Sequence, residues 1–553
     1  MNQQDDHSTS MREITRNRSG TGRIRLSRRS EWPRGHHNTA VFQDRAQSYR
    51  TLNRASGFLP ALFAACLSGF AFGPVATADE STPKQISGLK RELDAILAIP
   101  APAQYRLSAR VVDLETHRVL YDRNGDTPLM PASNMKLVVM AAAIEQLGPD
   151  YQFRTLLAIR DVDLVVIGGG DPTFGDEKLA AARNESMTAV FKDWARVLKK
   201  TGIRQIPGNI VVDDLLFDLK FTHPSWPSNQ YQSWYEAPIG GLNFNANCVQ
   251  AVVIPTQPNQ PARVELVPAN VGLPIDNKTI TGKKNAATIA RYRESDTLML
   301  RGSVLKKGTL QAITVRDPGL YFGAVLKSVL ESEGIKIKGR VVREKVRPAQ
   351  GILPDDCNLV AVHRAPIADA LRRCGKDSLG MIAEGLFKTL GARRDGLGTW
   401  DSGRKAVATF LDAAGVDKDQ FTLDDGSGLS RKNRLSAHVA TRLLSQMHES
   451  SGRQFELFKS ALAVAGTDGT MKKRLRGSDT KGRILAKTGY INGVWTLAGY
   501  IHTQSNHWLT FAFYYNDIRK TPSPKKRIDR ACRRLVHWPN KLPKKNETRK
   551  ASR

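Results

Sequence analysis

The sequence predicts an α+β fold, in which a core of helices and antiparallel strands is split by a long β-rich inserted region. Two observations place the core. Two strand-like runs at 105–122 precede a strongly apolar helical stretch at 131–148, and two further buried strands occupy 494–516. A third observation places the insertion, because short β-like runs separated by Pro, Gly and Asn dominate residues 157–355.

The first core elements follow in order. Residues 84–99 have helical periodicity, and residues 105–113 and 117–122 are strands joined by a polar turn. Ser133 lies at the start of the apolar helix, which Gly148 ends. This helix is apolar on every side, so we expect it to be buried.

The remaining elements lie beyond the first β-like runs. One helix at about 319–333 interrupts the insertion. Helices return at 360–395, most clearly in IADALRRCGKDSLGMIAEGLFKTLG, and the runs 494–502 and 508–516 are typical of adjacent buried strands. A basic helix follows at about 524–537, which we interpret as a solvated tail.

Length and charge narrow the classes of function. The chain has 553 residues, enough for two or three domains with a large core. Its formal net charge of +30 lies mostly at the ends, with +6 in residues 1–55 and +12 in residues 518–553. Because no zinc finger, aromatic RNA-binding signature or basic repeat accompanies this charge, we expect no nucleic-acid partner.

An apolar, uncharged run at residues 58–75 predicts a secretory signal peptide at about 46–78. The small residues Ala76-Thr77-Ala78 fit a cleavage site that would leave Asp79 as the first mature residue. We therefore expect a secreted or periplasmic protein whose residues 1–78 are an Arg-rich extension plus the signal. The alternative is an N-terminal membrane anchor, since about 18 apolar residues are borderline for spanning a bilayer.

Cysteine and histidine spacing predicts no catalytic metal and no cofactor. The five cysteines form no C-x-x-C, and the histidines form no H-E-x-x-H. The spacing supports no dense disulfide framework. One disulfide, between Cys357 and Cys374, is left open.

The tetrad Ser-x-x-Lys occurs seven times, so it does not identify a nucleophile by itself. Ser133 and Lys136 differ from the other matches because they lie one turn apart at the start of a buried helix. A serine hydroxyl needs a base, and a lysine serves when burial and a nearby cation lower its pKa. The competing interpretation is a helix cap and a surface lysine.

A second element, Lys487-Thr488-Gly489, lies on or beside the first strand of the terminal pair. Lys487 could be the nearby cation and could also attract a substrate carboxylate, to which Thr488 could donate a hydrogen bond. Gly489 would let the substrate lie against the strand. A second Lys-Thr-Gly, at 200–202, follows a helix-like run and predicts a helix C-cap.

These motifs, with several stretches between them, resemble the low-molecular-mass class C penicillin-binding proteins, the D-alanyl-D-alanine carboxypeptidase/endopeptidases. The resemblance covers about residues 85–520, in the order PASNMKLVVMAAA, GGGDPTF, WYEAPIGGLNFNAN, DDGSGLSRKNRLS, VAGTDGTMKKRL and AKTGYINGVWTLAGY. It implies a penicillin-recognising transpeptidase/β-lactamase-like core. That core would occupy 79–156 and 356–520, with an accessory region of one or two subdomains at 157–355 and a basic helix and tail at 521–553.

The resemblance also implies acyl transfer on peptidoglycan stem peptides and covalent inhibition by β-lactams. By similarity, Ser133 would form the acyl-enzyme and Lys136 would take its proton. Lys487 and Thr488 would hold the terminal carboxylate. The backbone N–H groups of Ser133 and Tyr490 would form the oxyanion hole, which contributes about 3–4 kcal/mol per donor in other serine enzymes.

The middle motif departs from the family pattern. The family has Ser-x-Asn in a helix, whereas the matching segment KDSLGMIAEGLF has Ser378 at the serine position and Gly380 at the asparagine position. The asparagine would bridge the first-motif lysine and the substrate amide, so Lys136 would lose a restraint. Losing such a hydrogen bond costs about 1.5–3 kcal/mol, which slows a reaction without abolishing it. Asn433 or a water could compensate, and Ser378 could still relay a proton to the leaving amine.

We therefore expect a secreted serine D-Ala-D-Ala carboxypeptidase that also cleaves peptidoglycan cross-links. One alternative is a catalytically impaired scaffold that binds peptidoglycan, because Gly380 replaces the asparagine. A third, less favoured interpretation is a serine β-lactamase or esterase on the same core. The basic helix near the C-terminus could also attract anionic envelope polymers weakly.

Overall fold

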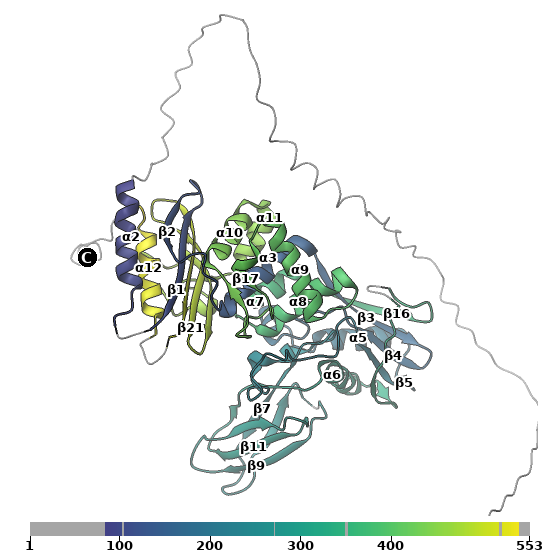
Figure 1. Cartoon of the computed structure of the whole chain (residues 1–553). Helices are drawn as coiled ribbons and strands as arrows, with labels where there is room; N and C mark the ends of the chain where they lie inside the picture. Colours follow the sequence, from purple (N-terminus) through teal and green to yellow (C-terminus); the bar gives the residue numbers. More distant parts are fainter. Residues whose placement is uncertain (1–82, 102–103, 270, 349–351, 519–522, 541–553) are drawn as a thin grey trace, which may run out of the picture. The chain divides into compact units, whose positions relative to one another are not determined.

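The computed structural model describes residues 83–101, 104–269, 271–348, 352–518 and 523–540 (Figure 1). The predicted signal peptide and Arg-rich extension lie outside these residues, so the signal and the alternative membrane anchor stay predictions. Among the residues described, no helix has both the length and the apolar character needed to span a bilayer.

The core is built on a six-stranded antiparallel sheet. Its strands lie in the order β19 (Ala463–Val464), β20 (Ile484–Ile491), β21 (Val494–His502), β22 (Trp508–Asn516), β1 (Arg106–Asp113) and β2 (Val119–Arg123). The predicted strands near both ends of the core are confirmed. They meet in one sheet because β1 pairs with β22 along its whole length.

The two faces of this sheet are covered by different helices (Figure 1). Helices α2 (Pro83–Leu97) and α12 (Lys525–Val536) pack on one face, where they share a buried cluster with Leu509 and Phe511 of β22. Ala512 and Tyr514 of the same strand belong to the cluster of the opposite, helical layer. The alternation follows from the two-residue period of a strand.

The interpretation of the basic helix as a solvated tail is wrong. In α12 the side chains of Ile528, Ala531, Cys532 and Leu535 are buried against α2 and the sheet. Their spacing is that of one helical face, so α12 is amphipathic and belongs to the core. Its many Lys and Arg residues concealed this apolar stripe. Residues 541–553 of the predicted tail are not among those described.

The helical layer on the other face surrounds α3 (Met135–Leu147). Every residue from Met135 to Ile144 is buried, which confirms the predicted buried helix. A 3-10 turn, η1 (Ala132–Asn134), precedes it, and Gly148 ends it in a left-handed conformation with φ of 90°. The other helices of the layer are α7 (Ile367–Lys376), α8 (Gly380–Asp395), α9 (Trp400–Ala413), α10 (Ala437–Glu449) and α11 (Gly452–Ala461).

The helical prediction for residues 360–395 is wrong at its start and misses a break. Residues Asn358–Pro366 form strand β16, because β3 (Gln152–Arg160) offers an antiparallel partner along its length. The helical run then divides into α7 and α8. Ser378 lies in the break with φ of 62°, an uncommon left-handed conformation for a residue other than glycine.

The accessory region has two parts. One is a five-stranded sheet in the order β15 (Val341–Arg343), β6 (Ile210–Asp213), β4 (Asp163–Ile167), β3 and β16, packed against α5 (Ala189–Lys200) and α6 (Pro318–Ser332). The other is all β. It contains β7 (Cys248–Ile254), β8 (Arg263–Val267), β9 (Ile275–Thr281), β10 (Thr288–Arg291), β11 (Leu298–Val304), β12 (Gly308–Thr309) and β13 (Ile313–Thr314). The first sheet extends past residues 157 and 355, where we placed the boundaries, because it includes all of β3 and β16.

The remaining elements are short. They are α4 (Glu177–Ala182), β5 (Gln205–Ile206), β14 (Lys336–Ile337), β17 (Phe421–Thr422), β18 (Arg434–Leu435), η2 (Trp234–Glu236), η3 (Asn245–Asn247), η4 (Lys418–Gln420) and η5 (Gly469–Met471). The second Lys-Thr-Gly is the end of α5, as predicted, with Thr201 at the C-cap and Gly202 at φ of 85°. Cys357 and Cys374 are both free and buried, so the disulfide left open does not form.

Candidate active site

Ser133 lies half-buried in η1, at the point where the chain enters α3. The turn is strained, because Ala132 has φ of 46°, which costs an L-residue roughly 1–2 kcal/mol. Two side chains tie it to neighbouring strands. Thr496 of β21 donates to the carbonyl of Pro131 at 2.9 Å, and the Asn134 amide donates to a carbonyl of β20 at 2.8 Å. The candidate nucleophile is therefore held against the sheet.

Lys136 is buried one turn beyond Ser133. Its Nζ lies 3.1 Å from Ser133 Oγ and 2.5 Å from the carbonyl oxygen of Ser427. Burial lowers the pKa of the Lys136 ammonium, and the negative charges of Asp425 and Glu384 partly oppose that effect. A buried amine with a lowered pKa, in hydrogen-bond contact with a serine hydroxyl, is suited to accept that hydroxyl's proton.

Lys487 lies on β20 and is fully buried. Its Nζ donates to Ser378 Oγ at 2.7 Å and to the carbonyl of Thr488 at 2.8 Å. Its pKa falls well below that of an ordinary lysine, first through burial and then through the charge of Lys136. The repulsion between the two lysines is mutual, so the charge that we expected to act on Lys136 also disfavours the charged form of Lys487. An anion bound beside Lys487 would favour its charged form.

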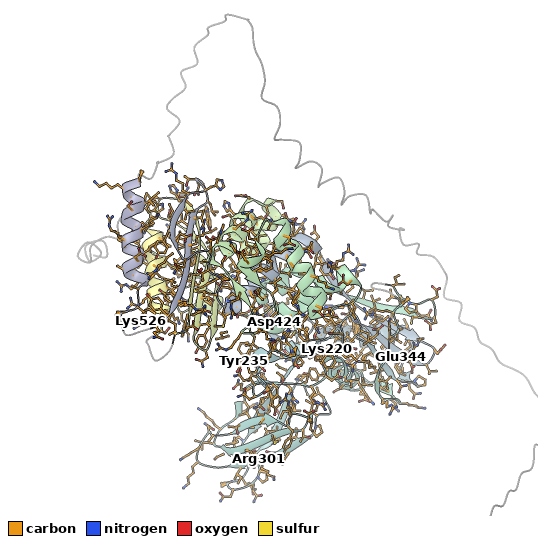
Figure 2. All side chains as sticks on the ribbon, viewed as in Figure 1. Lys220, Tyr235, Arg301, Glu344, Asp424 and Lys526 are labelled. Carbon is orange, nitrogen blue, oxygen red and sulfur yellow. The ribbon has the colours of Figure 1, made fainter. Side chains whose placement is uncertain are left out.

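Gly380 is the first residue of α8 and faces the Ser427 side chain. A Cβ built on Gly380 would lie 3.0 Å from the carbonyl oxygen of Tyr235 and 3.5 Å from Ser427 Cβ. Tyr235 belongs to η2 of the accessory region, and it is labelled near Asp424 in Figure 2. The place of the expected asparagine is therefore bordered by two segments of the protein.

Asn433 does not compensate by contacting Lys136. Its buried amide donates to Asp425 Oδ1 at 2.7 Å, and its oxygen accepts the N–H of Asp424 at 2.8 Å. These bonds close the turn of residues 424–433, which we call the Ser427 loop. Asn433 acts on the loop, and the loop in turn reaches Lys136.

Two buried carboxylates hold the Ser427 loop, and sequence reasoning assigned neither of them a role at the site. Glu384 of α8 accepts the N–H groups of Gly426 at 3.1 Å and Ser427 at 2.7 Å. Asp425 accepts the N–H groups of Gly428 and Ser430, each at 2.7 Å. Burial, and then the charge of Asp425, raise the pKa of Glu384 to about 7. The signal for Glu384 was its place in the segment KDSLGMIAEGLF, six residues after Ser378, where sequence reasoning gave it no role.

The Lys-Thr-Gly strand contributes three further residues. Thr488 Oγ1 donates to Thr470 Oγ1 of η5 at 2.9 Å, so Thr470 is a neighbour that sequence reasoning also missed. A Cβ on Gly489 would lie 2.0 Å from Thr496 Oγ1, so glycine is required here for η1 to pack against the strand. Tyr490 is 60% exposed at the end of the strand, and its ring packs on Trp495.

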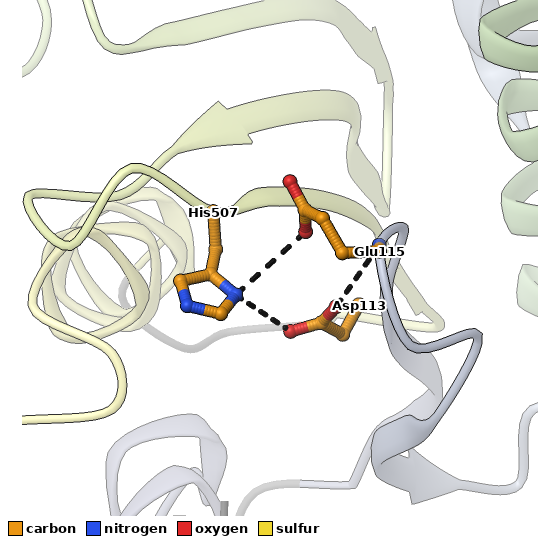
Figure 3. Close-up of side chains that lie close together, drawn as sticks. All are labelled: Asp113, Glu115 and His507. Atoms are coloured by element: carbon orange, nitrogen blue, oxygen red, sulfur yellow. Dashed lines mark hydrogen bonds and ion pairs between the residues drawn. The ribbon is translucent and has the colours of Figure 1, made fainter. Parts of the chain in front are cut away.

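Asp113, Glu115 and His507 form a separate cluster (Figure 3). His507 Nδ1 is 3.4 Å from Asp113 Oδ2 and 3.7 Å from Glu115 Oε2, close enough for the three side chains to share a metal ion. Asp113 and His507 lie at the end of β22 that begins with Trp508, whereas Asn516 at its far end bonds the segment leading to Ser133. Asp113 also closes the turn after β1 by accepting the N–H of Glu115 at 3.1 Å. The cluster stabilises that turn and is separate from Ser133.

Comparison with known proteins relates this chain to one family of peptidases. A profile of the D-Ala-D-Ala carboxypeptidase 3 (S13) family matches residues 89–536. A D-alanyl-D-alanine carboxypeptidase from Actinomadura sp. (strain R39) is 33% identical over 448 residues, which are 76% of this chain and 80% of that protein. The D-alanyl-D-alanine carboxypeptidase DacB from Haemophilus influenzae is 24% identical over 425 residues, 73% of this chain and 84% of that one.

Solved structures agree with these relatives. The crystal structure of penicillin-binding protein 4 (dacB) from Haemophilus influenzae superposes with a TM-score of 0.65 at 23% identity, covering 81% of this chain and 98% of that one. The same protein in complex with a β-lactam superposes with a TM-score of 0.62 at 22% identity. The likeness confirms the predicted penicillin-recognising α+β fold.

Proposed function

The chain belongs to the D-Ala-D-Ala carboxypeptidase 3 (S13) family and is a serine-type D-Ala-D-Ala carboxypeptidase, and from this premise we propose that Ser133 is its nucleophile. The observation that carries the proposal is the 3.1 Å contact between Ser133 Oγ and the buried Nζ of Lys136. Of the seven Ser-x-x-Lys tetrads, this one combines a buried lysine with a strained helix start.

In the acylation step, Ser133 Oγ attacks the carbonyl carbon that precedes the terminal D-alanine. Neutral Lys136 accepts the hydroxyl proton as the new C–O bond forms. The negative oxygen of the tetrahedral intermediate accepts hydrogen bonds from the N–H groups of Ser133 and Tyr490. The amide C–N bond then breaks, and the leaving nitrogen takes a proton from Lys136 or through Ser378, which releases D-alanine.

In the deacylation step, water attacks the ester carbonyl of the acyl-enzyme. The C–O bond to Ser133 breaks, one proton of the attacking water passes to Ser133 Oγ, and the shortened peptide leaves as a carboxylate after the other proton is released to solvent. Lys487 and Thr488 bind the terminal carboxylate of the incoming peptide. Burial disfavours the charged form of Lys487 in the free protein, and a bound carboxylate would favour that form and offset part of the cost of burial.

A labelling experiment tests the proposed nucleophile. The wild-type protein is expected to bind a fluorescent penicillin covalently, and Ser133→Ala is expected to lose the label while keeping its thermal unfolding temperature. Ser303→Ala is the matched control, because Ser303 heads another Ser-x-x-Lys tetrad, in β11. An undiminished adduct in Ser133→Ala would contradict the proposal.

We infer that the natural substrates are peptidoglycan stem peptides and, as an extension, the D-Ala-to-diamino-acid cross-links between them. The names of the relatives support the first part, since they are D-alanyl-D-alanine carboxypeptidases. Incubation with purified uncross-linked and cross-linked muropeptides separates the two activities. Release of D-alanine without monomer formation from the dimers would restrict the protein to carboxypeptidase activity.

The second candidate function is that of a catalytically impaired scaffold that binds peptidoglycan. The observation that favours it is the glycine, in place of an asparagine, at position 380. It predicts binding to sacculi without release of D-alanine, whereas the first candidate predicts both. A serine β-lactamase on the same core would instead hydrolyse a chromogenic β-lactam with many turnovers per minute.

We also propose that the protein is secreted after cleavage beside Ala78. Sequencing the N-terminus of the mature protein tests this, and a terminus upstream of residue 58 would favour the membrane anchor. A weak attraction to anionic envelope polymers is supported by exposed basic residues on α12, among them Lys525, Lys526 and Arg530. Binding to sacculi that is equally strong in low and in high salt would contradict that attraction.

A further inference from the structure

We propose that the backbone carbonyl of Ser427 replaces the missing asparagine as the acceptor that orients Lys136, and that Glu384 and Asp425 are positioning residues that hold this carbonyl in place. The inference rests on the proposed function, in which Lys136 is the base. In this inference the Ser427 loop orients Lys136, which is the task that the asparagine of a Ser-x-Asn motif would otherwise have.

The inference begins with the hydrogen bonds that Lys136 needs. As an ammonium, the buried amine of Lys136 has three N–H donors that need acceptors inside the protein, and as the neutral base of the acylation step it still has two. Ser133 Oγ accepts one at 3.1 Å, and the Ser427 carbonyl accepts another at 2.5 Å. A lysine has a flexible stem, so the second acceptor decides whether Nζ stays beside the nucleophile.

The peptide unit between Ser427 and Gly428 is fixed at both ends. Its carbonyl accepts from Lys136, and its N–H donates to Asp425 Oδ1 at 2.7 Å. In a trans peptide the C=O and N–H point in opposite directions, so the bond to Asp425 aims the carbonyl at Lys136. The two bonds also polarise one another, which strengthens both.

The next peptide unit toward the N-terminus is fixed by the helix that lacks the asparagine. Glu384 lies one turn beyond Gly380 on the same face of α8. One of its oxygens accepts the N–H of Ser427 at 2.7 Å, and the other accepts the N–H of Gly426 at 3.1 Å. Trp400 Nε1 donates to the carboxylate at 2.9 Å and holds its orientation. Helix α8 therefore reaches Lys136 through the Ser427 loop and not through residue 380.

Glycine at position 428 allows the loop to come this close. Gly428 has φ of 78°, and a Cβ there would lie 1.8 Å from the carbonyl oxygen of Ala132. No side chain fits in that space, so only glycine lets the loop lie against η1. The segment that carries the nucleophile and the loop that holds its base are thus in direct contact.

The space at Gly380 fits the same interpretation. A Cβ there would meet the Tyr235 carbonyl at 3.0 Å, which is tighter than most real contacts, and the Ser427 Cβ at 3.5 Å. Any side chain at position 380 would therefore need the Tyr235 segment to shift by a few tenths of an ångström, whereas the Ser427 Cβ lies at an ordinary contact distance. Gly380 therefore fits closely beneath the Tyr235 carbonyl and lies in contact range of the Ser427 loop.

The charges of Asp425 and Glu384 add a second effect. Both raise the pKa of Lys136 against the lowering effect of burial. The thiol of Cys374 acts on Lys136 in the same direction, and Lys487 is the neighbouring cation. Neutralising Asp425 is therefore expected to free the side chain of Lys136 from its position and also to lower the pKa of Lys136 further. A residue with a merely structural role would not produce both effects.

The test measures the rate of acylation by a fluorescent penicillin as a function of pH. Asp425→Asn keeps the size of the side chain and removes its charge. We expect the maximal rate of acylation to fall about ten-fold or more, with little change in the concentration for half-maximal rate, and the rise of rate with pH to move to lower pH. Glu384→Gln is expected to act in the same way and serves if Asp425→Asn does not fold.

Asp424→Asn is the matched control. Asp424 is the neighbouring carboxylate of the same loop, but it accepts from Ser430 Oγ and contacts neither the peptide unit of Ser427 nor Lys136. We expect its rate and pH profile to stay within about two-fold of the wild type. Equal effects of Asp424→Asn and Asp425→Asn, or a folded Asp425→Asn with the wild-type rate and profile, would overturn the inference.

Two substitutions at Gly380 give an independent test. Gly380→Ala introduces only the crowded Cβ, whereas Gly380→Asn adds the amide of the expected motif. We expect neither variant to exceed the wild-type rate of acylation, because the acceptor position is already occupied. A gain of about ten-fold or more in Gly380→Asn but not in Gly380→Ala would show that Lys136 lacks a restraint, and would overturn the inference. Loss of the proposed function has a different result, namely labelling that is absent from the wild type or persists in Ser133→Ala.

Discussion

Lys136 Nζ lies 2.5 Å from the carbonyl oxygen of Ser427, although 290 residues separate the two along the chain. The contact joins the first turn of α3 to a loop that follows the accessory region. It gives the candidate base a backbone partner, which no side-chain substitution removes directly. The position of Lys136 therefore depends on the groups that hold the Ser427 loop.

Replacement of Lys136 itself is expected to slow acylation strongly. Lys136→Met keeps an unbranched apolar side chain of similar length but has no amine, and general-base catalysis contributes about 10²–10⁴-fold to rate. The rate of acylation by penicillin should fall by about that factor while Ser133 stays intact. Lys405→Met is the control, since Lys405 is the exposed lysine of another tetrad. A rate within a few-fold of wild type would exclude Lys136 as the base.

The carboxylate subsite predicts a substrate-dependent effect at Thr488. Thr488→Val removes one donor to a charged group, worth about 1.5–3 kcal/mol, so kcat/KM for a peptide ending in D-Ala-D-Ala should fall about ten-fold or more. The same peptide with a C-terminal amide should lose little, because it offers no carboxylate. Thr488→Ser should keep most of the activity on both. Equal losses on the two peptides would place the carboxylate elsewhere.

The burial of Lys487 predicts a trade-off between activity and stability. Its folded-state pKa is lowered, so between that value and about 10.4 the unfolded chain binds a proton that the folded chain lacks. Stability therefore rises with pH through this window, and the penalty is largest at the lower pH. Lys487→Met removes the penalty and should raise Tm by about 2 °C or more near pH 7 while reducing activity.

The pH dependence of the difference in Tm between Lys487→Met and the wild type shows whether the buried amine is its cause. The gain in Tm of Lys487→Met over the wild type should shrink as the pH approaches 10, because the unfolded lysine then also loses its proton. Thermal unfolding followed at several pH values measures it. A gain that is constant with pH would mean that packing, and not the buried amine, explains the change.

The packing of α12 predicts a large effect on stability away from the site. Leu535 is fully buried between α12, α2 and the sheet, so Leu535→Ala should lower the free energy of unfolding by about 2–5 kcal/mol. Lys526→Ala, on the exposed side of the same helix, should change it by less than about 0.5 kcal/mol. Denaturant unfolding compares the two. Similarly small effects of the two substitutions on the free energy of unfolding would indicate that α12 is a solvated tail.

Local patterns in the sequence predicted much of the core. The run from Met135 to Ile144 is apolar on all sides, which is enough to identify a buried helix. The strands 494–502 and 508–516 appear with those bounds, because continuous apolar runs bounded by polar turns leave little choice of register. The position of Ser133 beside Lys136 followed from helical spacing alone.

The elements that sequence reasoning missed depend on distant partners. Strand β16 was assigned to a helix because its pairing with β3 involves residues some 200 positions earlier. The break at Ser378 depends on a left-handed backbone conformation. A serine in the sequence does not predict that conformation, because it is uncommon for residues other than glycine. In α12 the charged residues masked an apolar stripe of five residues.

The candidate site also contains residues that the sequence predicts and residues that depend on distant partners. The motif residues Ser133, Lys136 and Lys487 could be named from the sequence, because catalytic chemistry restricts residue type and spacing. The partner that replaces the asparagine could not, because it is a backbone carbonyl and any residue at position 427 would provide one. Glu384 and Asp425 act on that backbone, so their roles became visible only with the hydrogen bonds of the loop.

Peptide mapping of the penicillin adduct tests the central claim most directly. Trypsin cleaves after Arg123 and Lys136, which gives the peptide 124–136, and Ser133 is the one serine within it. After a brief incubation with penicillin and denaturation in acid, mass spectrometry should find the mass of the antibiotic on this peptide, with fragmentation placing it on Ser133. An adduct on any other peptide, or no adduct in a protein that still releases D-alanine, would contradict the assignment of Ser133 as the nucleophile.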